Sequence, residues 1–285
     1  MDEIRKIKFT LKSRPTIEGA GVRLKRAFGN DEPLLFDPFL LLDHFGSENP
    51  KDYMAGFPWH PHRGIETITY MIQGDIKHED SLGNGGVISS GDVQWMTAGS
   101  GIIHQEMPQK SDNFLLGFQL WANLPASNKM MDPRYRDVKK EQIPIVKINE
   151  DVEVRIICGE FNGIKGPVQD IVTEPEYLDV TISPNSEFKH LIRKGKTALA
   201  YVFEGDAFFD ENKDPKKYTG QLIVFGDGNE VKISTSNNKV RFLLISGNPI
   251  KEPIAWHGPI VMNTKEELRI AFEEYQNGTF CKIKK

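Results

Sequence analysis

The chain has 285 residues, of which 27% are charged and 10% are aromatic, a composition typical of a globular protein. Asp and Glu number 40 against 36 Lys and Arg, so the formal charge of -4 offers no basic field for direct binding of nucleic acid or of an anionic membrane. No apolar run approaches the ~20 residues of a membrane span, and the first residues lack a signal-peptide core, so we expect a cytoplasmic protein.

Short β-type runs make up most of the chain. They are separated by Gly, Pro, Asn and Asp, a pattern typical of β-sandwiches and β-barrels and not of βαβ units. The length exceeds the ~100–200 residues of a usual single domain, which favours two domains. The two cysteines, Cys158 and Cys281, lie far apart in sequence and predict neither a zinc knuckle nor a disulfide framework. We therefore predict an all-β protein.

The first chemically distinctive segment runs from residue 56 to residue 72 and contains the His-x-His pair His60 and His62. In a regular strand, side chains of equal parity share one face. His60, His62 and Glu66 should then point the same way as the alternating apolar residues that follow, Ile68, Tyr70 and Ile72. The interior of a small barrel is the natural place for such a set.

A second segment, residues 99–106, contains the i, i+2 pair His104 and Glu106 after two glycines that permit a turn. Nitrogen and oxygen donors from two neighbouring strands suit Fe, Mn, Ni, Cu or Zn, whereas Ca and Mg prefer all-oxygen shells. The two segments together predict one divalent transition metal ion per chain. Spacing alone leaves Glu66 and Glu106 as competitors for the fourth ligand position.

Between about Pro125 and Pro144 the sequence becomes polar, and we predict a linker there. The two halves resemble each other: residues 70–75 (Tyr-Met-Ile-Gln-Gly-Asp) match residues 201–206 (Tyr-Val-Phe-Glu-Gly-Asp), and Gly91-Asp92 matches Gly226-Asp227. This repetition predicts a duplicated β-barrel. The same offsets place Leu191, Arg193, Thr197, Lys239 and Arg241 where the first half has its donors, so we expect no metal in the second barrel.

One helix is predicted near the C-terminus. Thr264 and Glu267 have the spacing of a capping box, and four apolar residues before Gly278 fall on one helical face: Leu268, Ala271, Phe272 and Tyr275. The sequence therefore predicts a short helix after the second barrel.

Several longer stretches carry a resemblance to a known family. Within residues 37–125 they are His60-Pro-His-Arg-Gly64, Asp80-Ser-Leu-Gly-Asn84 and Gly91-Asp-Val-Gln-Trp-Met-Thr-Ala-Gly99, followed by His104-Gln-Glu106-Met107. Beyond them are Met130-Met-Asp-Pro-Arg-Tyr135, Ala255-Trp-His-Gly-Pro259 and Met262-Asn-Thr264. These motifs cover nearly the whole chain, which resembles the pirin family of the cupin superfamily.

The resemblance implies two cupin-type jelly-roll barrels in tandem, which we place at residues 1–130 and 131–285. It implies that three histidines and one glutamate of the first barrel hold the metal, which is usually iron in this family, and we therefore expect Fe(II) here, with Mn, Ni, Cu or Zn as alternatives. These ligands are His60, His62, His104 and Glu106 in this sequence. Glu66 is then left with a supporting or structural role.

The family carries two activities. One is a quercetin 2,3-dioxygenase activity, in which a flavonol binds the metal through a deprotonated hydroxyl, O2 is the second substrate, and Glu106 accepts the proton. The other is a metal- or redox-sensing role exerted through protein partners without turnover. We favour the enzyme because three histidines and a carboxylate leave coordination positions open and the sequence has no Lys/Arg-rich nuclear address. Phe57, Trp59 and Trp95 are candidates for pocket walls, although core packing is the more common role for such residues.

Overall fold

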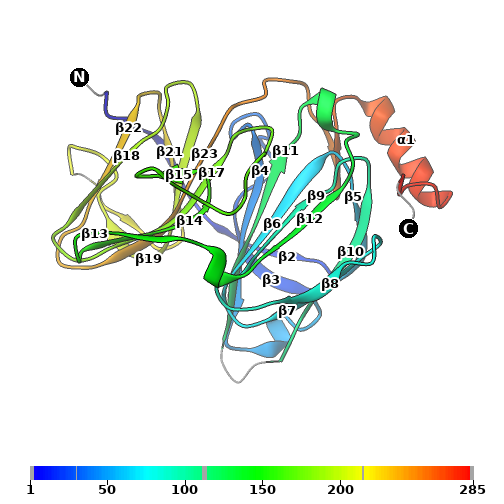
Figure 1. Cartoon of the computed structure of the whole chain (residues 1–285), viewed down its shortest axis with the longest axis horizontal. Helices are drawn as coiled ribbons and strands as arrows, with labels where there is room; N and C mark the ends of the chain where they lie inside the picture. Colours follow the sequence, from blue (N-terminus) through cyan, green and yellow to red (C-terminus); the bar gives the residue numbers. More distant parts are fainter. Residues whose placement is uncertain (1–2, 30, 111–113, 214, 283–285) are drawn as a thin grey trace. The chain divides into compact units, whose positions relative to one another are not determined.

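The computed structural model describes residues 3–29, 31–110, 114–213 and 215–282, which form strands, three short 3-10 helices and one α-helix (Figure 1). The chain forms two compact units. The N-terminal barrel unit comprises Arg14–Lys140 and Ile250–Lys285, and the C-terminal barrel unit comprises Met1–Ser13 and Glu141–Pro249. The predicted all-β fold is confirmed. The division differs from contiguous ranges 1–130 and 131–285 because each terminal segment clusters with the barrel more distant in sequence.

The N-terminal barrel unit contains two antiparallel sheets. A seven-stranded sheet has the order β12-β9-β6-β11-β4-β3-β2, and a four-stranded sheet has the order β5-β10-β7-β8. The 3-10 helices of this unit are η1 (Pro50–Asp52) and η2 (Ala126–Asn128). Its strands are β2 (Arg14–Glu18), β3 (Val22–Phe28), β4 (Phe39–Ser47), β5 (Phe57–His62), β6 (Ile65–Gln73), β7 (Ile76–Asp80), β8 (Gly85–Ile88), β9 (Val93–Thr97), β10 (Ile102–Pro108), β11 (Leu115–Asn123) and β12 (Arg134–Val138).

The predicted linker contains a strand of this sheet. Strand β12 lies inside the polar stretch 125–144 and pairs with β9, with Tyr135 opposite Met96 and Val138 opposite Val93. A strand at the edge of a sheet is paired on one side only, so it tolerates the charged residues that suggested a linker. The boundary between the two compact units falls after this strand, at Lys140.

The C-terminal barrel unit is built around a sheet in the order β1-β21-β19-β23-β17-β14-β13, with β20 paired to β19, and two small sheets, β15-β16 and β18-β22. A 3-10 helix, η3 (Lys140–Gln142), lies at the boundary. The strands are β1 (Ile7–Lys12), β13 (Ile145–Ile148), β14 (Val152–Cys158), β15 (Glu160–Phe161), β16 (Ile164–Lys165), β17 (Glu176–Ile182), β18 (Glu187–Leu191), β19 (Thr197–Ala207), β20 (Lys217–Tyr218), β21 (Gln221–Phe225), β22 (Glu230–Ser234) and β23 (Val240–Gly247).

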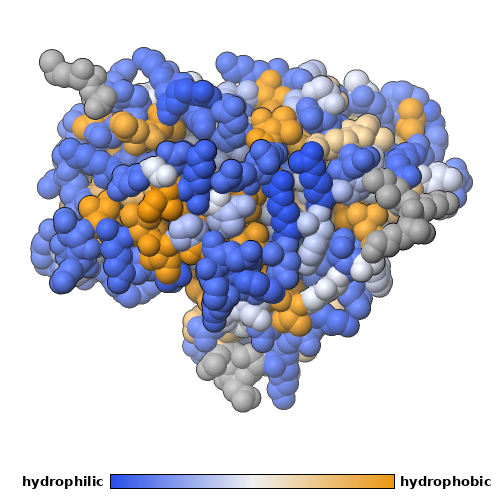
Figure 2. All heavy atoms as spheres, viewed as in Figure 1, coloured by the Kyte–Doolittle hydropathy of each residue, from blue (hydrophilic) through white to orange (hydrophobic). Residues whose placement is uncertain are grey.

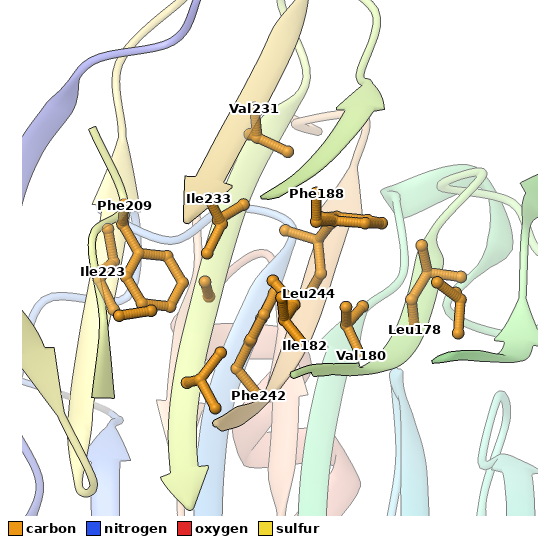
Figure 3. Packing of buried hydrophobic residues seen from close by; sticks show 14 of the residues in the cluster. Leu178, Val180, Ile182, Phe188, Phe209, Ile223, Val231, Ile233, Phe242 and Leu244 are labelled. Carbon is orange, nitrogen blue, oxygen red and sulfur yellow. The ribbon is translucent and has the colours of Figure 1, made fainter. Parts of the chain in front are cut away.

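The repeated sequence lies at equivalent places in the two units. Residues 70–75 span the end of β6 and the two residues after it, and residues 201–206 lie in the last part of β19; β6 pairs with β11, and β19 pairs with β23. Between the strands of the C-terminal unit is a continuous apolar core, in which Figure 3 shows Phe188, Leu244 and Ile182 grouped together. The duplication predicted from the sequence therefore agrees with the topology.

The segment after residue 250 packs on the N-terminal barrel unit. It consists of β24 (Ala255–His257), β25 (Ile260–Met262) and α1 (Lys265–Gln276), which has the expected capping box of Thr264 and Glu267. Lys129 Nζ donates to the carbonyls of Gly64 (2.9 Å) and Val261 (3.0 Å) and so ties β25 to the barrel. The predicted helix is confirmed.

Hydrophilic residues cover most of the face in Figure 2, with smaller hydrophobic patches between them. Among the described residues, the single α-helix is too short and too polar to cross a membrane.

Candidate metal centre

Three predicted donors meet where β5 and β10 run side by side in antiparallel register. His104 lies directly opposite His60, and Ile102 lies opposite His62. One ring nitrogen from each of His60, His62 and His104 falls within 4.8 Å of the others. The two segments identified from the sequence thus converge on one cluster.

The backbone fixes which nitrogens of the cluster are available. The Nδ1 atom of His60 lies 2.8 Å from the carbonyl oxygen of Pro58, and the Nδ1 atom of His62 lies 3.0 Å from that of Pro259. A carbonyl oxygen only accepts hydrogen bonds, so each Nδ1 carries the proton and each Nε2 presents a lone pair. These two Nε2 atoms are 3.0 Å apart. Two lone pairs at this distance repel each other unless a cation lies between them.

His104 adds a further donor. It is fully buried, and neither ring nitrogen has a hydrogen-bond partner in the described part of the chain. Burial, reinforced by repulsion from the neighbouring histidines, holds the pKa of His62 and of His104 well below 6.5. The rings are therefore neutral near pH 7, as metal ligands must be. The cluster fits a transition metal ion.

Glu106 lies on the same inward face of β10 as His104, because residues 102, 104 and 106 are buried while the intervening ones are half-buried. Its Oε1 accepts a hydrogen bond of 2.8 Å from Thr69 Oγ1. Burial raises the pKa of Glu106 to about 7, although the Thr69 hydrogen bond opposes the shift. The donor atoms that lie within 4.8 Å of one another come from the three histidines, and Glu106 is outside this group, so its role as fourth ligand remains a prediction.

Glu66 does not share the face of the histidines, contrary to the parity expectation. Gly64, with φ +77, interrupts the strand between β5 and β6 and resets the alternation of side chains. As a result Thr69 lines the cavity while Glu66, of opposite parity on β6, turns away and accepts a 2.6 Å hydrogen bond from Thr97. The expectation assumed one regular strand from residue 60 to residue 72, and that assumption was wrong.

A cavity of about 540 Å³ opens beside the cluster and is lined by His60, His62 and Glu106 among others. Phe57 and Trp59 form part of its wall, as expected, whereas Trp95 is buried on β9 and is not among the lining residues. The sequence argument missed two aromatic walls, Trp121 and Trp256. Trp121 packs edge-on against His62, with ring centroids 5.0 Å apart.

Trp256 and Pro259 come from the C-terminal segment, which the sequence argument assigned to the other barrel. The motif Ala255-Trp256-His257-Gly258-Pro259 had been noted for its resemblance and not for a position near the metal. The signal available in the sequence was the composition of this motif, in which the aromatic residues Trp256 and His257 precede the turn-forming pair Gly258-Pro259.

The four remaining histidines lie outside the three-histidine cluster. His257 and His44 contact aromatic rings elsewhere, and His190 pairs with Glu176 at 3.3 Å. His78 differs, because it is fully buried with its ring centroid 5.4 Å from that of His104 and stacked on Tyr135. It borders the cluster without being one of the grouped donors.

Comparison with known proteins decides the family. Residues 21–122 match the model of the Pirin family, and residues 177–281 match that of the Pirin C-terminal cupin domain. Human pirin is 40% identical over 281 residues, covering 97% of this chain and 94% of pirin. The chain belongs to the pirin family.

Two further comparisons support the assignment. A pirin-like protein of Caulobacter vibrioides is 40% identical over 278 residues, covering 97% of this chain and 99% of the relative. The crystal structure of a quercetin 2,3-dioxygenase from Acinetobacter baumannii superposes with a TM-score of 0.89 at 30% identity and covers 97% of this chain and 98% of that one. Both domains of the fold are therefore shared with these proteins.

Proposed function

We propose that this member of the pirin family is a metal-dependent dioxygenase that acts on a flavonol such as quercetin. The observation that carries the proposal is the pair of Nε2 lone pairs of His60 and His62, 3.0 Å apart and beside His104, at the wall of an aromatic-lined cavity. The similarity to a structure named quercetin 2,3-dioxygenase supports the same class of reaction.

The proposed ligands are His60, His62 and His104 through nitrogen and Glu106 through a carboxylate oxygen. Fe(II) is the ion we propose, and Mn, Ni, Cu or Zn would also accept this donor set. When bound, such an ion supplies a coordination point for the substrate oxygens and an electronic path between substrate and O2.

The protein itself orients the substrate and handles one proton. Phe57, Trp121 and Trp256 offer flat apolar walls against which aromatic rings can pack. A flavonol loses its 3-hydroxyl proton as it binds, and Glu106, which lines the cavity beside the histidines, is placed to accept that proton. Thr69 holds the Glu106 carboxylate at 2.8 Å. In the overall reaction both atoms of O2 enter the ring-opened ester, and one ring carbon leaves as carbon monoxide.

Aerobic turnover of quercetin by metal-loaded protein tests the proposal. We expect quercetin to lose its long-wavelength absorbance and one molecule of carbon monoxide to be released for each molecule of quercetin consumed. Both should occur only when O2 is present and metal is bound. Glu106→Gln should lower the rate by more than its effect on metal content, because an amide does not accept the hydroxyl proton.

If the protein binds metal and flavonol but does not consume the flavonol with any of the metals named above, the dioxygenase proposal fails. A metal- or redox-sensing role exerted through protein partners would then take its place.

A further inference from the structure

A row of polar side chains crosses the otherwise apolar floor of the cavity. The β-sheet register places Arg26 of β3 opposite Asp43 of β4, Asp43 opposite Gln119 of β11, and Gln119 opposite Thr69 of β6. All four residues line the cavity. Because neighbouring strands lie about 4.8 Å apart, the row extends roughly 14 Å from Thr69, beside Glu106, to Arg26.

The rows on either side of it are largely apolar. One consists of Leu24, Phe45, Gly117 and Met71, and the other contains Leu41, Trp121 and Thr67. Apolar side chains in the middle row would therefore pack with these neighbours and would be sufficient for folding. The buried polar groups of the middle row are paired with one another, since Arg26 donates to Asp43 and Thr69 lies 2.8 Å from Gln119 Oε1, and their carboxylate and amide oxygens keep further acceptor capacity toward the cavity.

The charges of the row favour one kind of ligand group. Arg26 donates to Asp43 through Nε (2.8 Å) and Nη2 (2.7 Å), and its Nη1 lies 2.8 Å from Glu18 Oε1. One guanidinium therefore faces two carboxylates, a formal excess of one negative charge at this end of the cavity. Such a site accepts hydrogen bonds from hydroxyl groups and repels anions.

A second ion pair shows that bidentate geometry alone would not make a ligand site. In the C-terminal barrel unit Arg241 donates to Asp179 through Nε (2.9 Å) and Nη2 (2.5 Å). Asp179 and Arg241 have the opposite parity to the core residues Leu178, Val180 and Phe242, so this pair lies on the outer side of its sheet. The Arg26–Asp43 pair instead points into the cavity.

We propose that Asp43, Glu18 and Gln119 form a hydroxyl-recognition subsite on the part of the cavity wall that leads from Thr69 to Arg26. It selects aromatic substrates that carry phenolic hydroxyl groups distant from the oxygens that chelate the metal. For a flavonol these are the hydroxyls of the B ring, the aryl ring away from the 3-hydroxyl and 4-carbonyl oxygens. This subsite rests on the proposed function in one respect, namely that the 3-hydroxyl and 4-carbonyl oxygens of the flavonol bind the metal at the histidines.

Anaerobic binding of matched compounds to the metal-loaded full-length protein tests this subsite without requiring turnover. The probes are 3-hydroxyflavones with no, one or two hydroxyl groups on the B ring, measured by titration calorimetry. A site that hydrogen-bonds a hydroxyl through a charged partner discriminates strongly against an analogue lacking it, so we expect the hydroxylated compounds to bind at least about tenfold more tightly. A B-ring carboxylate should weaken binding.

Asp43→Asn should reduce this ratio to near one while leaving the affinity for the unhydroxylated compound unchanged. Glu18→Gln provides a second test in a residue whose side chain is 40% exposed, so folding is little affected if Asp43→Asn proves unstable. Asp179→Asn is the matched control, because it removes a similar ion pair outside the cavity and should keep the ratio of the unmodified protein.

Three results would overturn the proposal: equal affinity for all three flavonols, tighter binding of the carboxylate, or no measurable binding of any of them. Failure of the proposed function is a separate observation, since discrimination among bound flavonols without any aerobic turnover would retain the subsite and remove the dioxygenase.

Discussion

In the N-terminal barrel unit, β5 and β10 place His60 opposite His104. The equivalent strands of the C-terminal unit are β18 and β22. In the N-terminal unit β5 and β10 directly precede β6 and β11, which pair with each other, and in the C-terminal unit β18 and β22 directly precede β19 and β23, which also pair with each other. There Phe188 lies opposite Ile233. One topology thus holds a cluster of nitrogen donors in one unit and apolar side chains in the other.

The interiors differ accordingly. Valine, isoleucine, leucine and phenylalanine fill the C-terminal unit in one continuous core, whereas the interior of the N-terminal unit also contains buried histidines and carboxylates and a cavity of about 540 Å³. His190, the imidazole of β18 in the C-terminal unit, is held by Glu176. Duplication therefore supplies the scaffold, and a few inward positions determine whether a barrel binds a ligand or only stabilises the fold.

The largest difference expected between the units concerns metal content. The purified full-length protein should contain one transition metal ion, and the double variant His60→Ala with His104→Ala should contain none, because two of three nitrogen donors are removed. Elemental analysis provides the measurement. His190→Ala is the control and should keep the full amount. Metal retained in the double variant would place the ion elsewhere.

The apolar core of the C-terminal unit should be much less tolerant of truncation than the cavity wall. Phe242 is fully buried and packs against Phe209 with ring centroids 5.2 Å apart. Phe242→Ala should lower the free energy of unfolding by about 3–5 kcal/mol. Phe57→Ala, at a half-buried wall position, should cost no more than about 2 kcal/mol. Chemical denaturation measures both, and equal losses would show that the cavity is packed like a core.

The two competing glutamates allow a finer test of the N-terminal unit. Glu106→Gln should weaken metal affinity more than Glu66→Gln, because Glu106 borders the cavity and Glu66 is bound to Thr97. Loss of a supporting residue typically costs 10- to 100-fold, and loss of a ligand should cost more. Competition with a chelator gives both affinities. The reverse order would make Glu66 the ligand.

The metal-free protein should also show a pH dependence that the C-terminal unit, in its described residues, lacks a group to produce in the same way. Burial raises the pKa of Glu106 from 4.5 to about 7, so folding favours its protonated form. Its contribution to stability should be fully present below about pH 4.5 and should be lost as the pH rises through about 7. The free energies of unfolding of the metal-free protein and of metal-free Glu106→Gln should therefore differ by an amount that changes between about pH 4.5 and about pH 7. A constant difference would exclude the shift.

The sequence predicted the barrels, the helix and the converging histidines because each rests on a local pattern. His104 and Glu106 share a face of one regular strand, and Thr264 with Glu267 forms a cap within four residues. The predictions that failed depended on events outside the local pattern. Gly64 adopts a positive φ that resets side-chain parity, so Glu66 turns away.

Other features depend on contacts distant in sequence. Pro259 supplies the carbonyl that fixes the His62 tautomer from 197 positions away, and no periodicity reports such a contact. His78 resembles an ordinary core histidine in sequence and borders the cluster only through the pairing of β7 with β10. The polar row from Arg26 to Thr69 becomes visible only once four strands are aligned.

The most direct test of the metal centre is anomalous diffraction from crystals of the metal-loaded protein, recorded at the absorption edge of the bound ion. The account predicts one anomalous peak per chain, within bonding distance of a ring nitrogen of each of His60, His62 and His104 and of a carboxylate oxygen of Glu106. A peak in the C-terminal barrel unit, or a peak in the N-terminal unit that contacts Glu66 instead of Glu106, would contradict it.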